Sequence, residues 1–198
     1  MDPDPVSRPL VLASTSVYRR ELLARLRIPF VTARPEVDES ALEGETPRAT
    51  AERLACAKAR AVAASHPDAL VIGSDQVAYC GATIYGKPGN AARAIAQLRE
   101  LRGRTVLFDT AVCVFDAATG SCRVRTVPTE VRVRPLSSDE IERYVAAEQP
   151  FDCAGAARSE GLGIALLESI RGEDPTALVG LPLIALCAML REEGLAIP

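Results

Sequence analysis

Two long stretches of alternating residues in the middle of the chain constrain its fold most strongly. They are RTVLFDTAVCVFD (residues 104–116) and CRVRTVPTEVRVRPL (residues 122–136), and only a short segment separates them. Alternation of apolar and polar residues is typical of β-strands, and strands that follow each other closely usually pair antiparallel. The second half of the chain is therefore predicted to contribute antiparallel strands to a sheet.

The first half of the chain instead alternates apolar runs with helical patterns. The runs PLVLAS (residues 9–14) and ALVIGSDQVAY (residues 69–79) predict buried strands, and the second is expected to end near Gly73 and to reach Asp75 and Gln76. Periodicity and capping residues, including Thr46 and a Ser137–Glu140 capping box, predict the helices. These helices are expected within residues 17–28, 46–66, 90–101, 137–148 and 174–194. A final strand is expected over residues 161–172, and Pro182 is expected in the first turn of the last helix.

These elements together place the chain in the α/β class. We expect a mixed, curved sheet flanked by helices, with two lobes around a cleft. The chain has 198 residues and contains neither an internal repeat nor a linker of low complexity, so residues 1–198 are predicted to form a single domain. Residues 1–8 are predicted to be a flexible N-terminus.

Composition and charge exclude several classes of protein. Hydrophobic residues make up 48% of the chain and charged residues 25%, which is typical of a globular protein. The net charge of -3 argues against a dedicated nucleic-acid binder. No apolar run is long enough for a membrane span, and the N-terminus MDPDPVSRP lacks the features of a secretory signal. A cytoplasmic protein without a nucleic-acid or membrane partner is therefore expected.

Histidine and cysteine usage narrows the chemistry further. His66 is the only histidine and lies in a turn, so a histidine-dependent triad or a site with several histidines is excluded. The 6 cysteines include no C-x-x-C pair, and most lie among apolar neighbours. They are predicted to be buried free thiols rather than disulfides or zinc ligands. Chemistry in this chain must depend on carboxylates, lysines and arginines.

The segment GATIYGKPG (residues 81–89) comes within one residue of a phosphate-binding P-loop. Gly81, Gly86 and Lys87 match the pattern G-x-x-x-x-G-K-[ST], but Pro88 stands where a Ser or Thr would bind magnesium. Gly81 is also predicted to lie in a hairpin turn, so the segment is not a working P-loop. Taken alone, Lys87 is a turn lysine beside the start of a helix.

Two segments supply candidate carboxylates. Asp75 in GSDQ is expected at the end of a buried strand, where α/β proteins commonly bind ligands, although it could also cap the following turn. The loop PEVDES (residues 35–40) contains Glu36, Asp38 and Glu39. This loop is either a metal site or an acidic loop exposed to solvent. Aspartate and glutamate are typical of both, because their carboxylates bind hard cations and are also well solvated.

Two other segments supply candidate binding groups. Ser14, Ser16 and Arg19 surround the predicted start of a helix, where free backbone N–H groups favour an anion. The alternative there is a capped amphipathic helix with solvated arginines. The segment ARSEGLG (residues 157–163) places Glu160 in a turn flanked by glycine. Together with the lysines and the acidic loop, these groups suit phosphoryl chemistry on a nucleotide.

Five motifs in this order resemble the Maf family of nucleoside triphosphate pyrophosphatases. They are LVLASTSVYRRELL, PEVDE, IGSDQV, YGKPG and CAGAARSEGLG…DPTALVGLPLIAL, and they run from about Leu10 to Leu190. The resemblance implies a Maf/ITPase-like fold and the release of pyrophosphate from a nucleoside triphosphate. It also implies a divalent metal cofactor, Mg²⁺ or Mn²⁺, and a housecleaning role against non-standard nucleotides.

The motif Ser74-Asp75-Gln76 is similar to the branch that hydrolyses 7-methyl-GTP to 7-methyl-GMP and pyrophosphate. Enzymes for dTTP and UTP usually have A-D-T there. The resemblance implies that Asp75 is the proton acceptor and that Tyr18, Gln76 and Glu160 select the base. A 7-methylated guanine carries positive charge, which favours stacking on an aromatic ring. A carboxylate can accept hydrogen bonds from the guanine edge.

The remaining expected roles concern the phosphates and the metal. Glu39 is expected to hold the metal, with Asp38 as a second ligand. The residues expected to bind and neutralise the phosphates are Ser14, Arg19, Lys58 and Lys87. Two alternatives stay open, namely a dTTP/UTP pyrophosphatase of the same family and a non-catalytic nucleotide-binding regulator of septum formation. The sequence also leaves open whether the protein is a homodimer.

Overall fold

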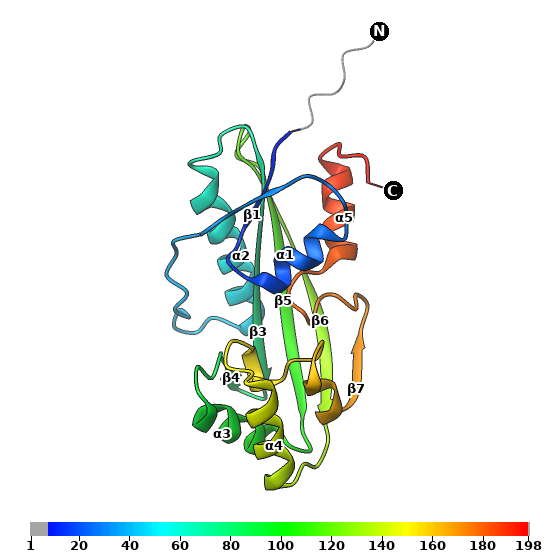
Figure 1. Ribbon diagram of the computed structural model, residues 1–198. Coiled ribbons are helices and arrows are strands. Elements are labelled where there is room, and N and C mark those ends of the chain that lie inside the picture. The colour runs from blue at the N-terminus through cyan, green and yellow to red at the C-terminus, as the bar shows by residue number, and fades with distance from the viewer. Residues whose placement is uncertain (1–7, 198) are drawn as a thin grey trace. The chain divides into compact units, whose positions relative to one another are not determined.

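The computed structural model describes residues 8–197, which form an α/β fold (Figure 1). The helices are α1 (Val17–Ala24), α2 (Pro47–Ala63), α3 (Ala91–Leu101), α4 (Ser138–Glu148) and α5 (Leu183–Glu192), with 3-10 helices η1 (Ala154–Ala156) and η2 (Leu162–Leu166). The strands are β1 (Leu10–Ala13), β2 (Val31–Ala33), β3 (Leu70–Cys80), β4 (Thr83–Tyr85), β5 (Thr105–Asp116), β6 (Cys122–Val133) and β7 (Leu167–Gly172). No helix in this part of the chain is long and apolar enough to cross a membrane.

The strands form a mixed sheet, as the sequence predicts. Their hydrogen-bonded order is β2-β1-β3-β5-β6-β7, and β4 pairs with β3 outside this path. Strand β1 is parallel to both β2 and β3, whereas β4 is antiparallel to β3 and β7 is antiparallel to β6. The parallel pairs come from the first half of the chain, where helices separate the strands.

The chain divides into two compact units built from interleaved segments. Within the described residues, the first unit contains residues 8–75, 110–127 and 174–197, and the second contains residues 76–109 and 128–173. Strands β3, β5 and β6 contribute residues to both units. The predicted flexible N-terminus falls on residues 1–7, outside the described residues, and on Arg8, whose guanidinium pairs with Asp116.

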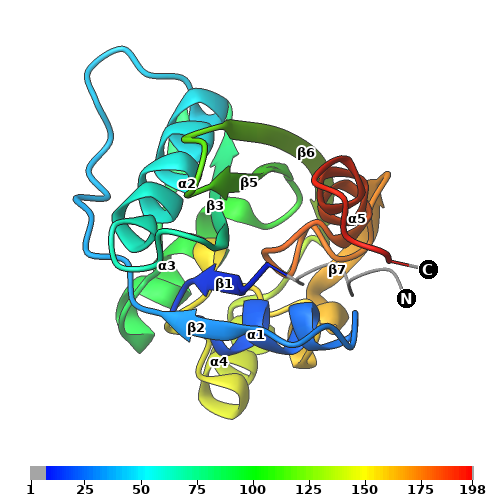
Figure 2. The same cartoon turned by 90° about the horizontal axis from the view of Figure 1, so that it is seen from above.

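In the first unit, α2 covers one face of the strands and α1 and α5 cover the other (Figure 2). The core on the α1 and α5 side includes Leu12 and Ile72 from the strands. Leu22 and Leu23 of α1 and Met189 of α5 pack in the same core. Because side chains alternate along a strand, the neighbours of these strand residues face α2.

The alanine-rich sequence of α2 allows this helix to lie very close to β3. Ala51, Ala55 and Ala59 are completely buried. A Cβ atom added to Gly73 of β3 would lie 2.1 Å from the carbonyl oxygen of Ala55, so only glycine fits there. The predicted N-cap of α2 is confirmed, since the Thr46 side chain accepts a hydrogen bond from the backbone N–H of Ala49.

Several predicted boundaries were wrong. Strand β3 does not end near Gly73 but continues to Cys80, because its last residues pair with β4. Helix α1 ends at Ala24 rather than at residue 28, and Arg27 beyond it has a positive φ of 56°. Pro182 precedes α5 as its N-cap instead of lying in its first turn. The final strand is also shorter than predicted, because residues 162–166 form η2.

The second unit keeps the predicted capping box of α4. The Ser137 side chain accepts from the backbone of Glu140, and the Glu140 side chain accepts from the backbone of Ser137. Asn90 caps α3 in a similar way by accepting from the backbone N–H of Arg93. The segment after β3 forms the predicted hairpin turn, with Cys80 paired to Thr83. The hairpin and the Asn90 cap lie on either side of the loop that carries Lys87.

Candidate active site

The best-defined polar cluster in the first unit is an ion pair between α2 and β3. The Lys58 ammonium lies 2.7 Å from a carboxylate oxygen of Asp75. Both side chains are almost completely removed from solvent, with exposed fractions of 6% and 11%. A buried charge is costly unless it is paired, so each side chain requires the other.

The position of this pair follows from the fold of β3. Gly73 brings α2 against the strand, and Asp75 lies two residues further on the same face. Asp75 was predicted at the end of a strand, but it lies in the interior of β3. The strand therefore holds this carboxylate more rigidly than a terminal loop would.

Glu39 adds a second carboxylate to the same lysine. Its oxygen lies 2.7 Å from the Lys58 ammonium, and its side chain remains 61% exposed. Glu39 comes from the loop between β2 and α2, within the PEVDES segment. Two carboxylates from distant parts of the sequence thus pair with one cation. The carboxylate of Asp75 is buried, and that of Glu39 is open to solvent.

The start of α1 provides a second group of polar atoms in the first unit. Ser14 is buried directly after β1, and its hydroxyl accepts a hydrogen bond from the Ser16 backbone at 3.1 Å. Ser16 is the N-cap of α1 and accepts from the Arg19 backbone at 3.3 Å. The predicted strand-to-helix junction is confirmed, and helix N-termini of this kind favour anions.

Arg19 is anchored by a backbone carbonyl rather than by a carboxylate. Its Nε atom donates to the carbonyl oxygen of Gly180 at 2.8 Å. Burial lowers the pKa of Arg19, while the charges of Asp75 and Glu39 act in the opposite direction. The guanidinium therefore lies within the electrostatic reach of both carboxylates, and its terminal nitrogens can serve an anionic ligand.

Sequence reasoning missed the role of Ser74. Its hydroxyl lies 2.8 Å from the carbonyl oxygen of Ala111 and 2.9 Å from that of Gly180. Ser74 is completely buried and faces away from α2, because it alternates with Asp75 along β3. It ties the strand that carries Asp75 to the loop that anchors Arg19. The only feature of the sequence that could have indicated this role is the position of Ser74 in the motif GSDQ.

The loop before α5 is itself fixed by Asp174, which sequence reasoning also missed. The Asp174 carboxylate accepts from the backbone and hydroxyl of Thr176 and from the Ile184 backbone at 2.7 Å. The Thr176 hydroxyl in turn accepts from the Leu183 backbone at 2.8 Å. Asp174 therefore satisfies N–H groups at the start of α5 and orders the loop up to Gly180.

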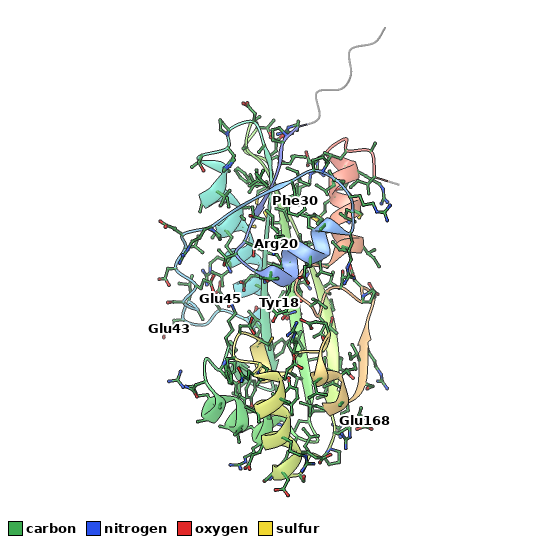
Figure 3. The ribbon with its side chains drawn as sticks, in the orientation of Figure 1. Tyr18, Arg20, Phe30, Glu43, Glu45 and Glu168 are labelled. Atoms are coloured by element: carbon green, nitrogen blue, oxygen red, sulfur yellow. The ribbon has the colours of Figure 1, made fainter. Side chains whose placement is uncertain are left out.

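Two predicted base-selecting residues, Tyr18 and Gln76, and the predicted metal ligand Asp38 are partly or fully open to solvent. Tyr18 projects from the first turn of α1 and is half-buried (Figure 3). Gln76 follows Asp75 in β3, is half-buried and is the first residue of the second unit. Asp38 is exposed, and its carboxylate accepts from the backbone of Ser40 at 2.9 Å. A hydrogen bond from the Ser40 side chain, together with this one from the backbone, lowers the pKa of Asp38.

Lys87 lies in the second unit on a loop with a fixed backbone. The carbonyl oxygen of Gly86 accepts from the Gln97 side chain at 3.1 Å, and the N–H of Gly89 donates to the carbonyl of Phe151 at 2.9 Å. Lys87 is exposed between these anchors, and no group within residues 8–197 forms a hydrogen bond or ion pair with its ammonium. Helix α3 begins only after Asn90, which confirms that the segment is not a P-loop.

Glu160 lies in a turn of the second unit that Glu148 fixes. The Glu148 carboxylate accepts from the Arg158 guanidinium at 3.1 Å and from the Leu162 backbone at 2.8 Å. A Cβ atom on Gly163 would approach the carbonyl oxygen of Arg158 to 2.4 Å, so the turn requires glycine. Glu160 itself is exposed and accepts from the Ser159 hydroxyl at 3.2 Å.

The carboxylates of the first unit fit a hard divalent cation only as a partial ligand set. Glu39 and Asp75 both reach one cation, the Lys58 ammonium. Mg²⁺ is commonly bound by one or two carboxylates together with water and substrate phosphates, so a pair of carboxylates is compatible with such a site. In residues 8–197, no three carboxylates bring their oxygens within 4.8 Å of one another. Asp38 is therefore not joined to the pair as a third close ligand.

Comparison with known proteins assigns a family. The model of the family described as Maf-like protein matches residues 9–193. A 7-methyl-GTP pyrophosphatase of Aromatoleum aromaticum is 64% identical over 96% of this chain and 97% of its own length. Proteins of the same name are 58% identical in Albidiferax ferrireducens, over 98% of both chains, and 53% identical in Pseudomonas putida, over 96% of this chain and 99% of the relative.

Proposed function

The chain belongs to the Maf-like protein family, and we propose that it hydrolyses 7-methyl-GTP to 7-methyl-GMP and pyrophosphate. The names of relatives that match nearly its whole length support this substrate. The structural observation that carries the proposal is the convergence of Asp75 and Glu39 on Lys58. A buried carboxylate beside cations is suited to accepting a proton during hydrolysis of a polyanion.

In the proposed reaction, a water molecule attacks the α-phosphorus. The bond from the water oxygen to phosphorus forms, and the bond from phosphorus to the bridging oxygen of pyrophosphate breaks. Asp75 accepts the proton that the water loses. Because β3 and the ion pair with Lys58 restrict the carboxylate, little reorganisation is needed when the proton moves.

Cationic side chains and backbone N–H groups would neutralise the phosphates of the nucleotide. In the first unit, this task falls to Lys58, Arg19 and the helix start at Ser14. In the second unit, it falls to Lys87, whose exposed ammonium is open to a ligand. Charge builds on the departing pyrophosphate as the bond breaks, so these groups are expected to act mainly in the transition state.

Glu39 and Asp75 are the residues that would hold Mg²⁺ or Mn²⁺, with Asp38, from the same loop as Glu39, as a further candidate. When bound, such an ion polarises phosphoryl oxygens and lowers the pKa of water. Within the chain itself, Glu39 is open to solvent whereas Asp75 is buried. Glu39 is therefore the more accessible of the two carboxylates.

We propose that Tyr18, Gln76 and Glu160 select the base. The positively charged 7-methylguanine ring suits stacking on the aromatic ring of Tyr18. The exposed carboxylate of Glu160 can accept from the N1–H and the amino group of guanine, and Gln76 can donate to or accept from a base edge. A pyrimidine lacks both the positive charge and this donor pattern, so it is expected to bind less well.

The first test is pyrophosphate release from a panel of 7-methyl-GTP, GTP, UTP, dTTP and CTP, with Mg²⁺ and with Mn²⁺. The expected result is that the protein releases pyrophosphate fastest from 7-methyl-GTP and that this release is largely lost in Asp75→Asn. A preference for UTP and dTTP would favour the pyrimidine branch of the family. Nucleotide binding without turnover would favour the non-catalytic regulator. We place the reaction in the cytoplasm, and sedimentation of the active protein would measure whether it is a homodimer.

A further inference from the structure

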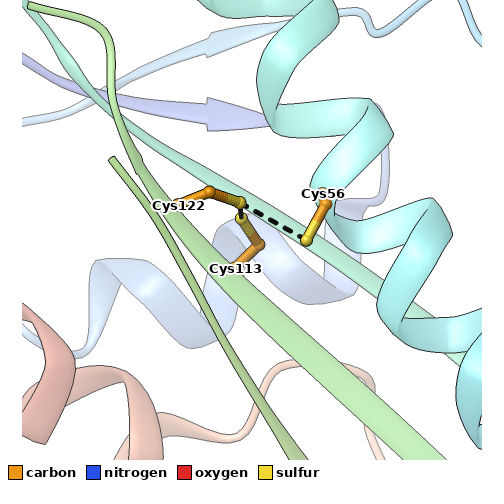
Figure 4. Close-up of side chains that lie close together, drawn as sticks. All are labelled: Cys56, Cys113 and Cys122. Atoms are coloured by element: carbon orange, nitrogen blue, oxygen red, sulfur yellow. Dashed lines mark hydrogen bonds between the residues drawn. The ribbon is translucent and has the colours of Figure 1, made fainter. Parts of the chain in front are cut away.

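Three cysteine side chains of the first unit gather on the face of the strands that α2 covers (Figure 4). Cys56 lies on α2, Cys113 on β5 and Cys122 at the start of β6. The sulfur of Cys122 is 3.5 Å from that of Cys113 and 3.5 Å from that of Cys56. All three sulfurs lie within 4.8 Å of one another, and no other set of three His, Cys, Asp or Glu residues in 8–197 is so close.

No spacing pattern in the sequence indicates this cluster. All 6 cysteines are free, as predicted. Cys80 and Cys113 are buried, whereas the other four are half-buried. Zinc was disfavoured because no C-x-x-C pair exists, but the fold brings together thiols that lie far apart along the chain. A C-x-x-C pair places two zinc ligands on one turn of the chain. Its absence does not exclude a site whose ligands come from one helix and two strands.

The spacing of the sulfurs matches that of thiolates around a single metal ion. A metal–sulfur bond of about 2.3 Å places neighbouring sulfurs about 3.8 Å apart in a tetrahedral site and about 4.0 Å apart in a trigonal one. Two of the three separations are 3.5 Å, within a few tenths of an ångström of these values, and the third is at most 4.8 Å. Small rotations of the three cysteine side chains would bring the sulfurs to the distances of a metal site.

We propose that Cys56, Cys113 and Cys122 form a binding site for a thiophilic ion of the Zn²⁺ type. Three thiolates are soft ligands that favour such an ion over Mg²⁺, and water would supply the fourth ligand. Protons still held by the thiols pass to the solvent when the ion binds. This site is separate from the carboxylates of Glu39 and Asp75, and it does not depend on the proposed hydrolysis.

The surroundings of the cluster favour the thiolate form at one of the three ligands, Cys56. The pKa of Cys56 is lowered to about 6, chiefly because Cys113 donates a hydrogen bond to it, with further contributions from Cys122 and the charge of Arg60. The same hydrogen bond raises the pKa of Cys113, and burial raises the pKa of Cys122, so an ion must displace protons from these two thiols when it binds. Cys113 is fully buried, whereas Cys56 and Cys122 are half-buried, so an ion can enter from their side.

An ion at this site would join α2 to both strands of the β5–β6 pair. The three ligands come from three elements of the first unit, so binding would stabilise the folded state relative to the unfolded chain. Helix α2 also carries Lys58, two residues after Cys56. The site is therefore expected to affect the thermal stability of the unit that contains the ion pair with Asp75.

The test uses the full chain, reduced and then freed of metal with a chelator. Titration with Co²⁺ should produce a thiolate-to-metal charge-transfer band that saturates at one equivalent and disappears when Zn²⁺ displaces Co²⁺. In Cys56→Ala, the band should be lost, and the affinity for Zn²⁺ in competition with a chromophoric chelator should fall by about 100-fold or more. Cys187→Ala, which changes a half-buried cysteine outside the cluster, should behave as the unmodified chain.

The thiolate band separates this site from metal binding at the carboxylates, which produces no such band. Circular dichroism would verify that Cys56→Ala is folded, and Cys122→Ser provides a second ligand variant if it is not. No band in the reduced chain, or a band of equal strength in a folded Cys56→Ala variant, would overturn the proposal. A disulfide between Cys113 and Cys122 that persists in the reduced protein would overturn it as well.

Discussion

The candidate residues of the two units differ in how they are held. In the first unit, Lys58 and Asp75 are buried, lie on a helix and a strand, and neutralise each other. In the second unit, Lys87 and Glu160 are exposed and lie on turns whose backbones are fixed by other residues. Proton transfer benefits from a rigid group with little access to water, whereas a side chain that meets the ligand must be open to it.

This comparison implies two different responses to mutation. Changes in the buried pair should reduce both turnover and stability, because the partner is left as an unpaired buried charge. Changes on the exposed turns should alter turnover or substrate preference alone, because little folding energy depends on them. Four substitutions test this division, and their expected effects on catalysis decrease in the order given.

Asp75→Asn should have the largest effect. The amide has nearly the shape of the carboxylate but cannot accept the proton, so turnover of 7-methyl-GTP should fall by about 10²- to 10⁴-fold. Binding of the nucleotide should change much less, because the cations remain. Steady-state pyrophosphate release together with equilibrium binding would measure the two effects. A variant that retains most of its turnover would remove Asp75 from the role of base.

Lys58→Met should come next and should also reduce stability. Turnover should fall by about 10²- to 10³-fold, because a positioned cation is lost where charge builds up. The free energy of unfolding should fall by about 3–5 kcal/mol, because Asp75 remains buried without its partner. The double variant Lys58→Met, Asp75→Asn should recover part of the stability and none of the activity. Chemical denaturation of the three proteins would show whether the pair behaves as one unit.

Lys87→Ala should separate catalysis from stability. Turnover should fall by about 10²-fold, the lower end of the effect of a charge-stabilising donor. The melting temperature should stay unchanged, because Lys87 is exposed and its loop is held by Gly86 and Gly89. Arg93→Ala, at an exposed arginine on α3, is the matched control and should leave turnover unchanged. Equal losses in both variants would mean that general positive charge, and not this lysine, is required.

The sequence was sufficient for the parts of the site that depend on local patterns. Thr46 and the Ser137–Glu140 capping box follow from the preference of helix ends for hydroxyl and carboxylate groups, and both are confirmed. Asp75 was identified from its motif, although its position inside β3 was not. The reason is that pairing with β4 extends the strand, and a pairing partner cannot be read from the strand alone.

Contacts between distant segments could not be predicted in the same way. The pairing of Lys58 with Asp75 depends on the closeness of α2 and β3, which Gly73 permits. The hydrogen bond of Ser74 to the loop at Gly180 joins residues 106 positions apart. Periodicity shows which face of an element is apolar, but it does not show which polar groups will meet. Motif order along the chain supplied part of this information, through the resemblance to a family.

Glu160→Gln is the mildest of the four changes and tests substrate preference alone. The glutamine keeps the size of the side chain but removes the charge, so one charge-assisted hydrogen bond to the guanine edge becomes a neutral one. The preference for 7-methyl-GTP over UTP, expressed as a ratio of kcat/KM values, should fall by about 10-fold. Glu168→Gln, at an exposed glutamate of β7, is the control and should keep the ratio (Figure 3). An unchanged ratio in Glu160→Gln would remove Glu160 from base recognition. It would leave Tyr18 and Gln76 to account for it.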